Sequence, residues 1–286
     1  MSRIRLGRGI LLCYLFSSFL IHLDAKLLGY WSFDDKNKLG KDLSPNRNDG
    51  ELKGGTKWTE KGQVGGALLL VEAEDSYLEV PHDNSLNLKD QMTLMCWVKF
   101  TNPGDFEGLG REQSLIWKNA PFQTNKRFWA SYALRLFRRE FKAGFAFDAN
   151  MTKGRTVTAD EDQPEVNEWL HATAIADGAQ VKVYANGVEK ASVEQRGEFQ
   201  PTELPLTIGV DLRNPKAGAV RRDQLGFLAG IMDEVVILNH ALTAGQIREA
   251  MKLGEAGQSL EEFQPVFAVE SPGKLAIKWA EIKVRN

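Results

Sequence analysis

The chain has 286 residues, 26% of them charged, and its formal net charge at pH 7 is −2. That balance argues against nucleic acid as a partner, because binding to phosphate groups needs a basic surface. The length is sufficient for one β-sandwich domain with a full hydrophobic core.

The first 25 residues have the layout of a secretory signal peptide. Three arginines and no acid precede an apolar run at residues 10–23, and Ala25 ends the segment on a small side chain. The run has about 14 residues, which is short of the roughly 20 that a membrane-spanning helix needs. We therefore predict cleavage after Ala25, export to the periplasm or the extracellular space, and no membrane span in the mature chain. Retention of the segment as an anchor is the alternative.

Cleavage at this point would change the charge and the cysteine count. Loss of three arginines and Asp24 lowers the formal net charge from −2 to −4. Cys96 becomes the only cysteine, so we expect no intrachain disulfide and a fold that rests on its hydrophobic core.

Short alternating apolar runs, broken by Gly, Asn, Asp and Pro, fill most of the remaining sequence. Such runs at regular spacing are typical of a β-sandwich or a barrel. In chain order, the predicted strands cover residues 27–33, 67–71, 77–80, 93–100, 114–118, 130–137, 142–147, 169–176, 180–185, 188–193, 206–210 and 227–238. In the strand at 93–100, alternation puts Cys96 on the apolar face, which favours a small core residue over a reactive thiol. Asn186-Gly187 between two of the runs predicts a tight hairpin.

One segment after these strands predicts a helix. Thr243 and Gln246 have the spacing of a capping box, and Gly254 is well placed to end the helix. A single short helix after a dozen strands favours an all-β fold over an α/β fold. The tail, residues 255–286, is interpreted as a segment docked on its own domain, with a partner-binding segment as the alternative.

Several short motifs follow one another in a fixed order along the chain. They are Trp31-Ser-Phe33-Asp34, Gly62-x-x-Gly65-Gly66-Ala67-Leu68, Asp75-x-Tyr77-Leu78-x-Val80-Pro81, Thr93-Leu94-x-Cys96-Trp97-Val98-Lys99, Trp169-x-His171, Val183-Tyr184-x-Asn186-Gly187, Leu206-x-Ile208-Gly209 and Gly230-x-x-Asp233-Glu234-Val235. This series, over residues 27–251, resembles the laminin-G-like jelly-roll family of concanavalin A-like lectins and glucanases, in its secreted bacterial type. The resemblance implies a two-sheet antiparallel jelly-roll sandwich at residues 26–254, between the signal peptide (1–25) and the tail (255–286).

The same resemblance implies an exported, non-enzymatic binding module whose partner is a glycan or an extracellular protein. Two alternatives stay open, namely a glycoside hydrolase of the laminarinase-like fold and a structural or adhesion protein of the cell envelope. The hydrolase would need two carboxylates on one strand face. The nearest match is Asp160-x-Asp162-x-x-Glu165, which Pro164 interrupts and whose acidic surroundings favour a solvated loop. We therefore predict no catalytic residue.

Calcium is the one cofactor that the resemblance suggests. Its candidate ligands are Asp34, Asp75 and Asp233, which follow or begin predicted strands and carry the hard oxygen ligands that calcium prefers. The alternative is that these acids cap turns by accepting hydrogen bonds from backbone N–H groups.

The candidate ligand-binding residues come from a comparison with pentraxins, in which acids from two loops hold calcium at the ligand site. The slot after Ile208-Gly209 carries an acid, Asp211, whereas the matching loop at 119–131 is basic and aromatic. Its residues Asn125, Arg127 and Trp129 suit a sugar, because a flat ring stacks on the apolar face of a pyranose beside hydrogen-bonding neighbours. The alternative is that Trp129 begins the next strand and is buried.

Overall fold

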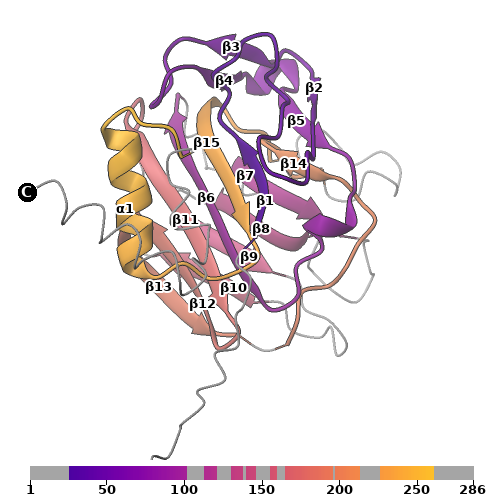
Figure 1. Cartoon of the computed structure of the whole chain (residues 1–286), viewed down its shortest axis with the longest axis vertical. Coiled ribbons are helices and arrows are strands. Elements are labelled where there is room, and N and C mark those ends of the chain that lie inside the picture. Colours follow the sequence, from indigo (N-terminus) through magenta and orange to yellow (C-terminus); the bar gives the residue numbers. More distant parts are fainter. Residues whose placement is uncertain are drawn as a thin grey trace, which may run out of the picture.

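The computed structural model describes residues 26–101, 113–120, 130–137, 140–145, 155–159, 165–195, 197–212 and 226–260. These residues form two antiparallel β-sheets that pack face to face, with one α-helix on the outside (Figure 1). The all-β jelly-roll sandwich that the sequence predicts is therefore confirmed.

The first sheet has eight strands, and all of its neighbouring strands are antiparallel. Their order across the sheet is β13 (Val188–Glu194), β12 (Gln180–Ala185), β11 (Trp169–Asp177), β6 (Gln91–Phe100), β15 (Gly230–Leu238), β4 (Ala67–Leu70) and β3 (Lys57–Thr59), with β1 (Leu27–Trp31) also paired to β15. The pairing of β15 with β6 is interrupted between Asp233 and Val236 by a bulge, in which Glu234 has a φ of 49°.

The second sheet has seven strands. Their order is β10 (Arg155–Ala159), β9 (Glu140–Phe145), β8 (Ala130–Phe137), β7 (Gln113–Asn119), β14 (Leu206–Ile208), β5 (Tyr77–Val80) and β2 (Glu51–Lys53). Two short 3₁₀ helices, η1 (Glu72–Glu74) and η2 (Asn84–Leu86), flank β5. Three strands that the sequence did not predict, β2, β3 and β10, all lie at sheet edges.

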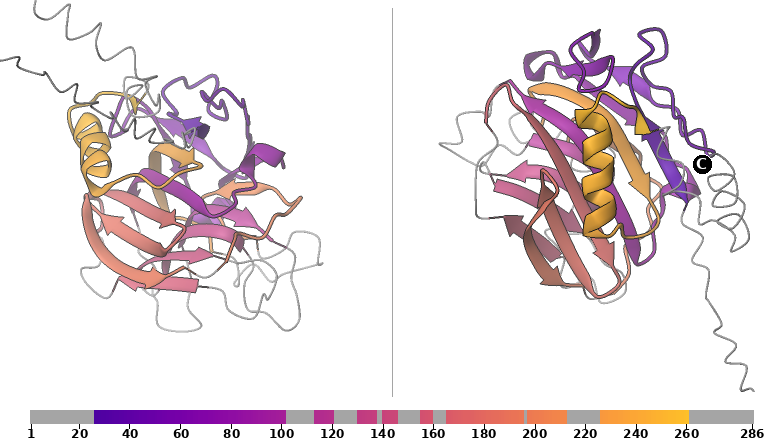
Figure 2. Two further views of the ribbon diagram at one scale, coloured as in Figure 1. Left: turned by 60° about the horizontal axis from the view of Figure 1, so that its bottom comes forward. Right: turned by 60° about the vertical axis from the view of Figure 1, so that its left-hand side comes forward.

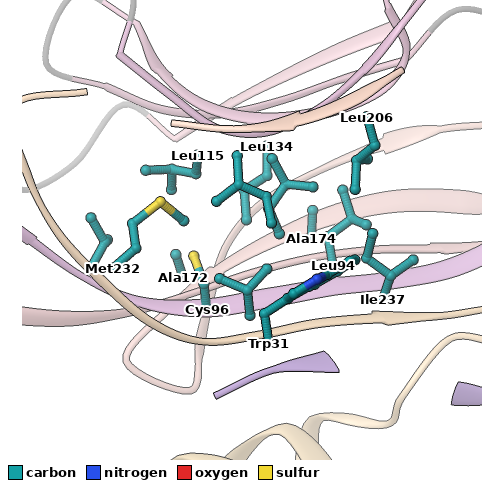
Figure 3. Close-up of a cluster of buried hydrophobic side chains, with 14 of the residues drawn as sticks. Trp31, Leu94, Cys96, Leu115, Leu134, Ala172, Ala174, Leu206, Met232 and Ile237 are labelled. Atoms are coloured by element: carbon teal, nitrogen blue, oxygen red, sulfur yellow. The ribbon is translucent and has the colours of Figure 1, made fainter. Parts of the chain in front are cut away.

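The hydrophobic core fills the space between the two sheets. Figure 3 shows Leu115 and Leu134 from the seven-stranded sheet facing Leu94, Cys96 and Met232 from the eight-stranded sheet. Cys96 is fully buried, as predicted, and burial raises the pKa of its thiol. The thiol is therefore a small core group and a poor nucleophile.

Helix α1 (Ala244–Glu255) lies across the outward face of the eight-stranded sheet (Figure 2). The predicted capping box is present, since the Gln246 N–H donates to Thr243 Oγ1 and Gln246 Oε1 accepts from the Thr243 N–H. Gly254 does not end the helix, which continues to Glu255. Gly257, with a φ of 69°, follows as the left-handed residue instead. Gly254 is buried against Trp97, where a Cβ atom would lie 2.3 Å from Nε1.

The residues that the structure describes contain no helix of sufficient length and apolarity to span a bilayer. The two outward faces of the sandwich differ: α1 covers one of them, and it is the only α-helix among the described residues. No α-helix among the described residues covers the outward face of the seven-stranded sheet, although Trp117, Asn119 and Thr207 at its centre are buried. This face is the one to search for a ligand site.

Candidate ligand-binding face

Strand alternation identifies the side chains on the outward face of the seven-stranded sheet. On β8, Tyr132 and Leu134 belong to the core, so Ala133 between them points outward. Ala133 pairs with Trp117 on β7, and Trp117 pairs with Thr207 on β14. These three residues thus form an outward row across the centre of the sheet.

Trp117 is the largest side chain of this row. Its ring packs on Ala130 and Ala133 in a small apolar cluster that is separate from the core. The Arg135 guanidinium lies over the ring, 5.4 Å from its centroid, in a cation–π contact. Its neighbours are small, and the indole ring is itself buried, with 3% of the residue exposed.

Three buried polar atoms on β7 have no hydrogen-bond partner within the residues that the structure describes. They are Ser114 Oγ, Trp117 Nε1 and Asn119 Oδ1. Ser114 pairs with the outward Arg135, and Trp117 and Asn119 follow at alternate positions, so all three lie on the outward side. Each such atom costs about 1–3 kcal/mol when it stays unpaired, and a native structure rarely keeps one without a reason.

Asn119 is held firmly in place although its carbonyl oxygen is unpaired. Its Nδ2 donates to the Pro205 carbonyl at 2.9 Å and to Thr207 Oγ1 at 3.4 Å, and Thr207 Oγ1 donates to the Val210 carbonyl at 2.7 Å. Because the amide group is fixed on its donor side, Oδ1 is a pre-oriented acceptor. Trp117 Nε1 is a donor and Ser114 Oγ is both, so β7 offers each kind of hydrogen bond.

Of the four predicted ligand residues, the structure describes only Asp211. Asn125, Arg127 and Trp129 lie outside the described residues. Asp211 is fully buried and follows Gly209, whose N–H donates to the Leu115 carbonyl, near the start of β7. The ends of the 119–131 loop lie at the other end of β7, where Asn119 pairs with Ala130. Asn119 is nevertheless linked to the residue before Asp211, because its Nδ2 donates to Thr207 Oγ1 and that hydroxyl group donates to the Val210 carbonyl. A site shared by Asp211 and the loop stays a prediction.

Sequence reasoning missed Ser114, Trp117 and Asn119. The available signal was the strand QSLIWKN itself. Trp117 and Asn119 are one and three residues after the inward-facing Ile116, so strand alternation places both on the outward face. The bulge between Ser114 and Ile116 shifts that phase within the strand, so alternation from the sequence alone assigns Ser114 to the wrong face.

Two of the three candidate calcium ligands hold the glycine-rich loop before β4. Asp34 Oδ1 accepts from the Gly66 N–H at 3.0 Å, and Asp233 Oδ2 accepts from the Val64 N–H at 2.9 Å. Asp75 follows η1 as its C-cap residue, with a φ of 51°. Among the described residues, no three His, Cys, Asp or Glu side chains gather as a group that could hold a metal ion. Calcium binding stays a prediction, and the visible role of Asp34 and Asp233 is to cap backbone N–H groups.

Asp233 and its neighbour Glu234 form a buried acidic pair on β15. Burial raises the pKa of Asp233 to about 8, and the nearby Glu234 and Asp34 carboxylates act in the same direction. Glu234 accepts hydrogen bonds from the Tyr30 hydroxyl, at 2.8 and 2.9 Å, and from the Leu260 N–H at 2.9 Å. Glu234 thus connects β1 to the segment after α1.

Most of the acidic motif considered for hydrolysis lies outside the described residues. Asp160 and Asp162 lie outside the described residues, and Glu165 is exposed. His171 is buried beside Trp97, with ring centroids 5.0 Å apart, and burial lowers its pKa to about 3. A neutral, buried imidazole of this kind has a packing role.

A family model described as the concanavalin A-like lectin/glucanases superfamily matches residues 72–248, which is more than half of the chain. No curated protein sequence gives a significant match. Among solved structures, the binding domain of Paraclostridial Mosquitocidal Protein 1 aligns with a TM-score of 0.59 and 18% identity, over 79% of this chain and 52% of that one. The botulinum neurotoxin serotype G binding domain aligns with a TM-score of 0.58 and 13% identity, over 80% and 51%.

Domain 4 of AbnA, a GH43 extracellular arabinanase from Geobacillus stearothermophilus, aligns with a TM-score of 0.52 and 21% identity, over 79% of this chain and 98% of that domain, in a structure with arabinotriose. The chain spans about half the length of the two toxin structures. At these identities the likeness to solved structures shows the fold. With the family match over residues 72–248, the chain belongs to the laminin-G-like family of the concanavalin A-like lectin/glucanases superfamily.

Proposed function

We propose that the chain is an exported, non-catalytic binding module that recognises a carbohydrate on the outward face of its seven-stranded sheet. The observation that carries the proposal is the row of buried, unpaired polar atoms of Ser114, Trp117 and Asn119 on β7. The likeness to domain 4 of AbnA, whose structure contains arabinotriose, supports an oligosaccharide as the class of ligand.

A sugar fits this row by its chemistry. A pyranose or furanose ring presents C–H groups on one face, which pack on an indole ring, and hydroxyl groups at its edge. Each hydroxyl group donates one hydrogen bond and accepts others, so it can serve the Nε1 donor of Trp117 and the Oδ1 acceptor of Asn119. A single small ligand would thereby remove the cost of several unpaired atoms. A protein ligand would instead need a separate side chain to pair with each of these unpaired atoms.

Ser114→Ala is the sharpest test, because the substitution removes only an unpaired hydroxyl group. We expect it to leave the free energy of unfolding unchanged or slightly raised, and to weaken oligosaccharide binding about tenfold, or about 1.4 kcal/mol. Ser76→Ala is the matched control, since Ser76 is also fully buried with an unpaired Oγ but lies between η1 and β5. It should bind as the wild type does.

The measurement is a glycan array followed by calorimetric titration with the best ligand, each with calcium and with a chelator. The two calcium conditions also test whether Asp34, Asp75 and Asp233 assist binding through a metal ion. Binding to no glycan under either condition, or equal affinity of the Ser114→Ala and wild-type proteins, would contradict the proposed site.

A further inference from the structure

The seven-stranded sheet carries a buried lysine at the end of β7, on the opposite side from the candidate ligand residues. Lys118 pairs with Tyr132 on β8 and with Leu206 on β14, and both of these belong to the core, so the lysine side chain points inward. Lys118 is fully buried. Asn119, the next residue along β7, points outward and belongs to the proposed site. The two neighbours thus reach opposite sides of one sheet.

Lys118 and Asn119 hold the same short segment, which precedes β14. Lys118 Nζ donates to the Leu204 carbonyl at 2.7 Å. The Asn119 N–H and the Asn119 Nδ2 both donate to the next carbonyl, that of Pro205, at 3.2 and 2.9 Å. The position of the Pro205 carbonyl determines how the Asn119 amide group is turned, and therefore where its unpaired Oδ1 points. Because Lys118 fixes the residue before Pro205, it acts on Asn119 through the backbone.

A histidine from a neighbouring strand end contacts this lysine. The ends of β5 and β7 flank the start of β14, since Val80, Leu206 and Lys118 are paired in a row. His82 follows β5 and is half-buried, and its Nδ1 lies 3.2 Å from Lys118 Nζ. Burial lowers the pKa of Lys118 to about 8, so the ammonium form predominates at neutral pH. An ammonium group has only donors, so His82 Nδ1 accepts this hydrogen bond.

Three other titratable side chains lie on the elements that surround the pair. Asp83 follows His82 and is exposed, and hydrogen bonds with Ser85 lower its pKa. Tyr132 faces the lysine from β8, and burial raises the pKa of its hydroxyl group. Glu203, on the segment before β14, is exposed. The shifts of Asp83 and Tyr132 move their titration away from neutral pH, whereas an imidazole group ordinarily changes its charge between about pH 5 and 8.

Protonation of His82 would place two donors face to face. A protonated imidazole carries a proton on each nitrogen and cannot accept from an ammonium group, and the two positive charges repel each other. Because Lys118 is fully buried, its ammonium group must move to replace the lost acceptor with water, which disturbs its hydrogen bond to the Leu204 carbonyl. We therefore infer that Lys118 is a positioning residue for Asn119, and that its contact with His82 makes ligand binding at the sheet face weaken in acid. The inference rests on the proposed function, because Asn119 belongs to the proposed site.

The first experiment measures this coupling without a ligand. In NMR spectra of the ¹⁵N-labelled chain from pH 5 to 7.5, the backbone and Nδ2 signals of Asn119 should shift with the same midpoint as the His82 imidazole signals. His82→Gln keeps an acceptor for Lys118 but cannot gain a proton, so it should abolish the shift at Asn119. His240→Gln is the matched control, because His240 is also half-buried but follows β15 in the other sheet, and it should keep the shift. An Asn119 signal that does not follow His82, or that still shifts in His82→Gln, would overturn the inference.

The second experiment measures affinity by calorimetric titration at pH 7 and pH 5, with the oligosaccharide that gives the strongest signal on the glycan array. Between these pH values the affinity of the wild type and of His240→Gln should fall about two- to tenfold, the range that corresponds to one hydrogen bond. His82→Gln should bind equally at both. Lys118→Met removes the donor to the Leu204 carbonyl, so it should bind more weakly at pH 7 and lose little more at pH 5. Lys118→Arg keeps a charged donor and should recover part of the affinity.

The two experiments separate a failure of this inference from a failure of the proposed function. If no glycan binds, the proposed sheet-face site is wrong, and the NMR titration still decides whether His82 acts on Asn119. If glycans bind with the same pH dependence in the wild type and in His82→Gln, the sheet-face site stands and the inference about His82 and Lys118 is wrong.

Discussion

Asp233 is a buried acid whose environment makes the stability of the domain depend on pH. Burial raises its pKa to about 8, whereas an aspartate in the unfolded chain titrates near about 3.9. Between these values the native state holds a proton that the unfolded state has released. The contribution of Asp233 to the free energy of unfolding therefore falls as the pH rises through this window.

Asp233→Asn should remove this contribution. His171 has the opposite effect on the free energy of unfolding below about pH 6.5, because burial lowers its pKa in the folded state to about 3. The effect of Asp233 is therefore clearest between pH 6.5 and 8. There we expect the wild type to lose up to about 1.4 kcal/mol per pH unit relative to the variant. Urea denaturation at half-unit pH steps measures the difference, and parallel profiles of the two proteins would contradict the prediction.

Lys118 should have a separate effect above pH 8. It is fully buried, its Nζ donates to the Leu204 carbonyl at 2.7 Å, and burial lowers its pKa to about 8. The unfolded lysine titrates near about 10.4, so between these values the unfolded state binds more protons and stability rises with pH. In Lys118→Met this rise should be absent.

The measurement for Lys118 is the difference between variant and wild type in urea denaturation from pH 8 to 10. The comparison is needed because burial raises the pKa of the Cys96 thiol, which lowers stability over the same range in both proteins. A difference that does not change with pH would mean that Lys118 is ionised equally in the folded and the unfolded chain.

Single residues show why the sequence predicts the core better than the site. Cys96 was placed correctly because strand alternation determines its face. Ser114 was missed because a bulge reverses that alternation. Asp34 and Asp233 were recognised as special, but whether such acids cap backbone N–H groups or bind calcium depends on how the loop at Gly62–Gly66 folds around them, which no local pattern encodes.

Among the elements, α1 offers two glycines with opposite expected effects. A Cβ atom at Gly254 would lie 2.3 Å from Trp97 Nε1, whereas one at Gly245 meets only Thr243 Oγ1 at 3.8 Å. Gly245→Ala should stabilise the domain by about 0.5–1 kcal/mol through helix propensity. Gly254→Ala should destabilise it by about 1–3 kcal/mol, because the helix must move away from the sheet.

Thermal and urea denaturation of both glycine variants measure these effects. The two substitutions are chemically identical and lie in the same helix, so a difference in sign reports the contact with Trp97. Equal stabilisation by both would mean that α1 does not pack tightly on the eight-stranded sheet at its C-terminal end.

Element prediction succeeded where burial leaves a pattern in the sequence. Strands such as β6 and β11 lie inside a sheet, bury long stretches and were predicted within two residues at either end. β2, β3 and β10 are edge strands of three to five residues that pair on one side only. Strands this short contain too few residues for alternation to distinguish them from loops.

At the scale of the whole molecule, the order of the sequence motifs predicted the jelly roll because turns and core strands recur in register along the chain. The order of the motifs did not predict the candidate ligand face. It depends on which outward face is covered, and α1 covers the eight-stranded sheet through contacts between residues such as Ile247 and Met95 that are far apart in the sequence. The difference between the two outward faces thus arises from tertiary packing, which no local sequence pattern encodes.

The segment after α1 contributes to this cover, and its role can be isolated by two truncations. Leu260 is buried with Met95 and Ile247, its N–H donates to Glu234, and the Ser259 hydroxyl lies 2.7 Å from that of Tyr30. A chain that ends after Leu260 keeps all of these contacts. A chain that ends after Glu255 loses them and uncovers the Glu234 carboxylate.

We expect the shorter chain to be less stable than the longer one by more than about 2 kcal/mol, because it loses a buried leucine side chain and hydrogen bonds to the buried Glu234 carboxyl group. Urea denaturation of both truncated chains measures the difference. Leu260→Ala in the full chain is the control, because it removes only the apolar part and should cost less than the truncation. If both truncated chains unfold at the same urea concentration, residues 256–260 do not stabilise the sandwich, and the interpretation of this segment as docked is wrong.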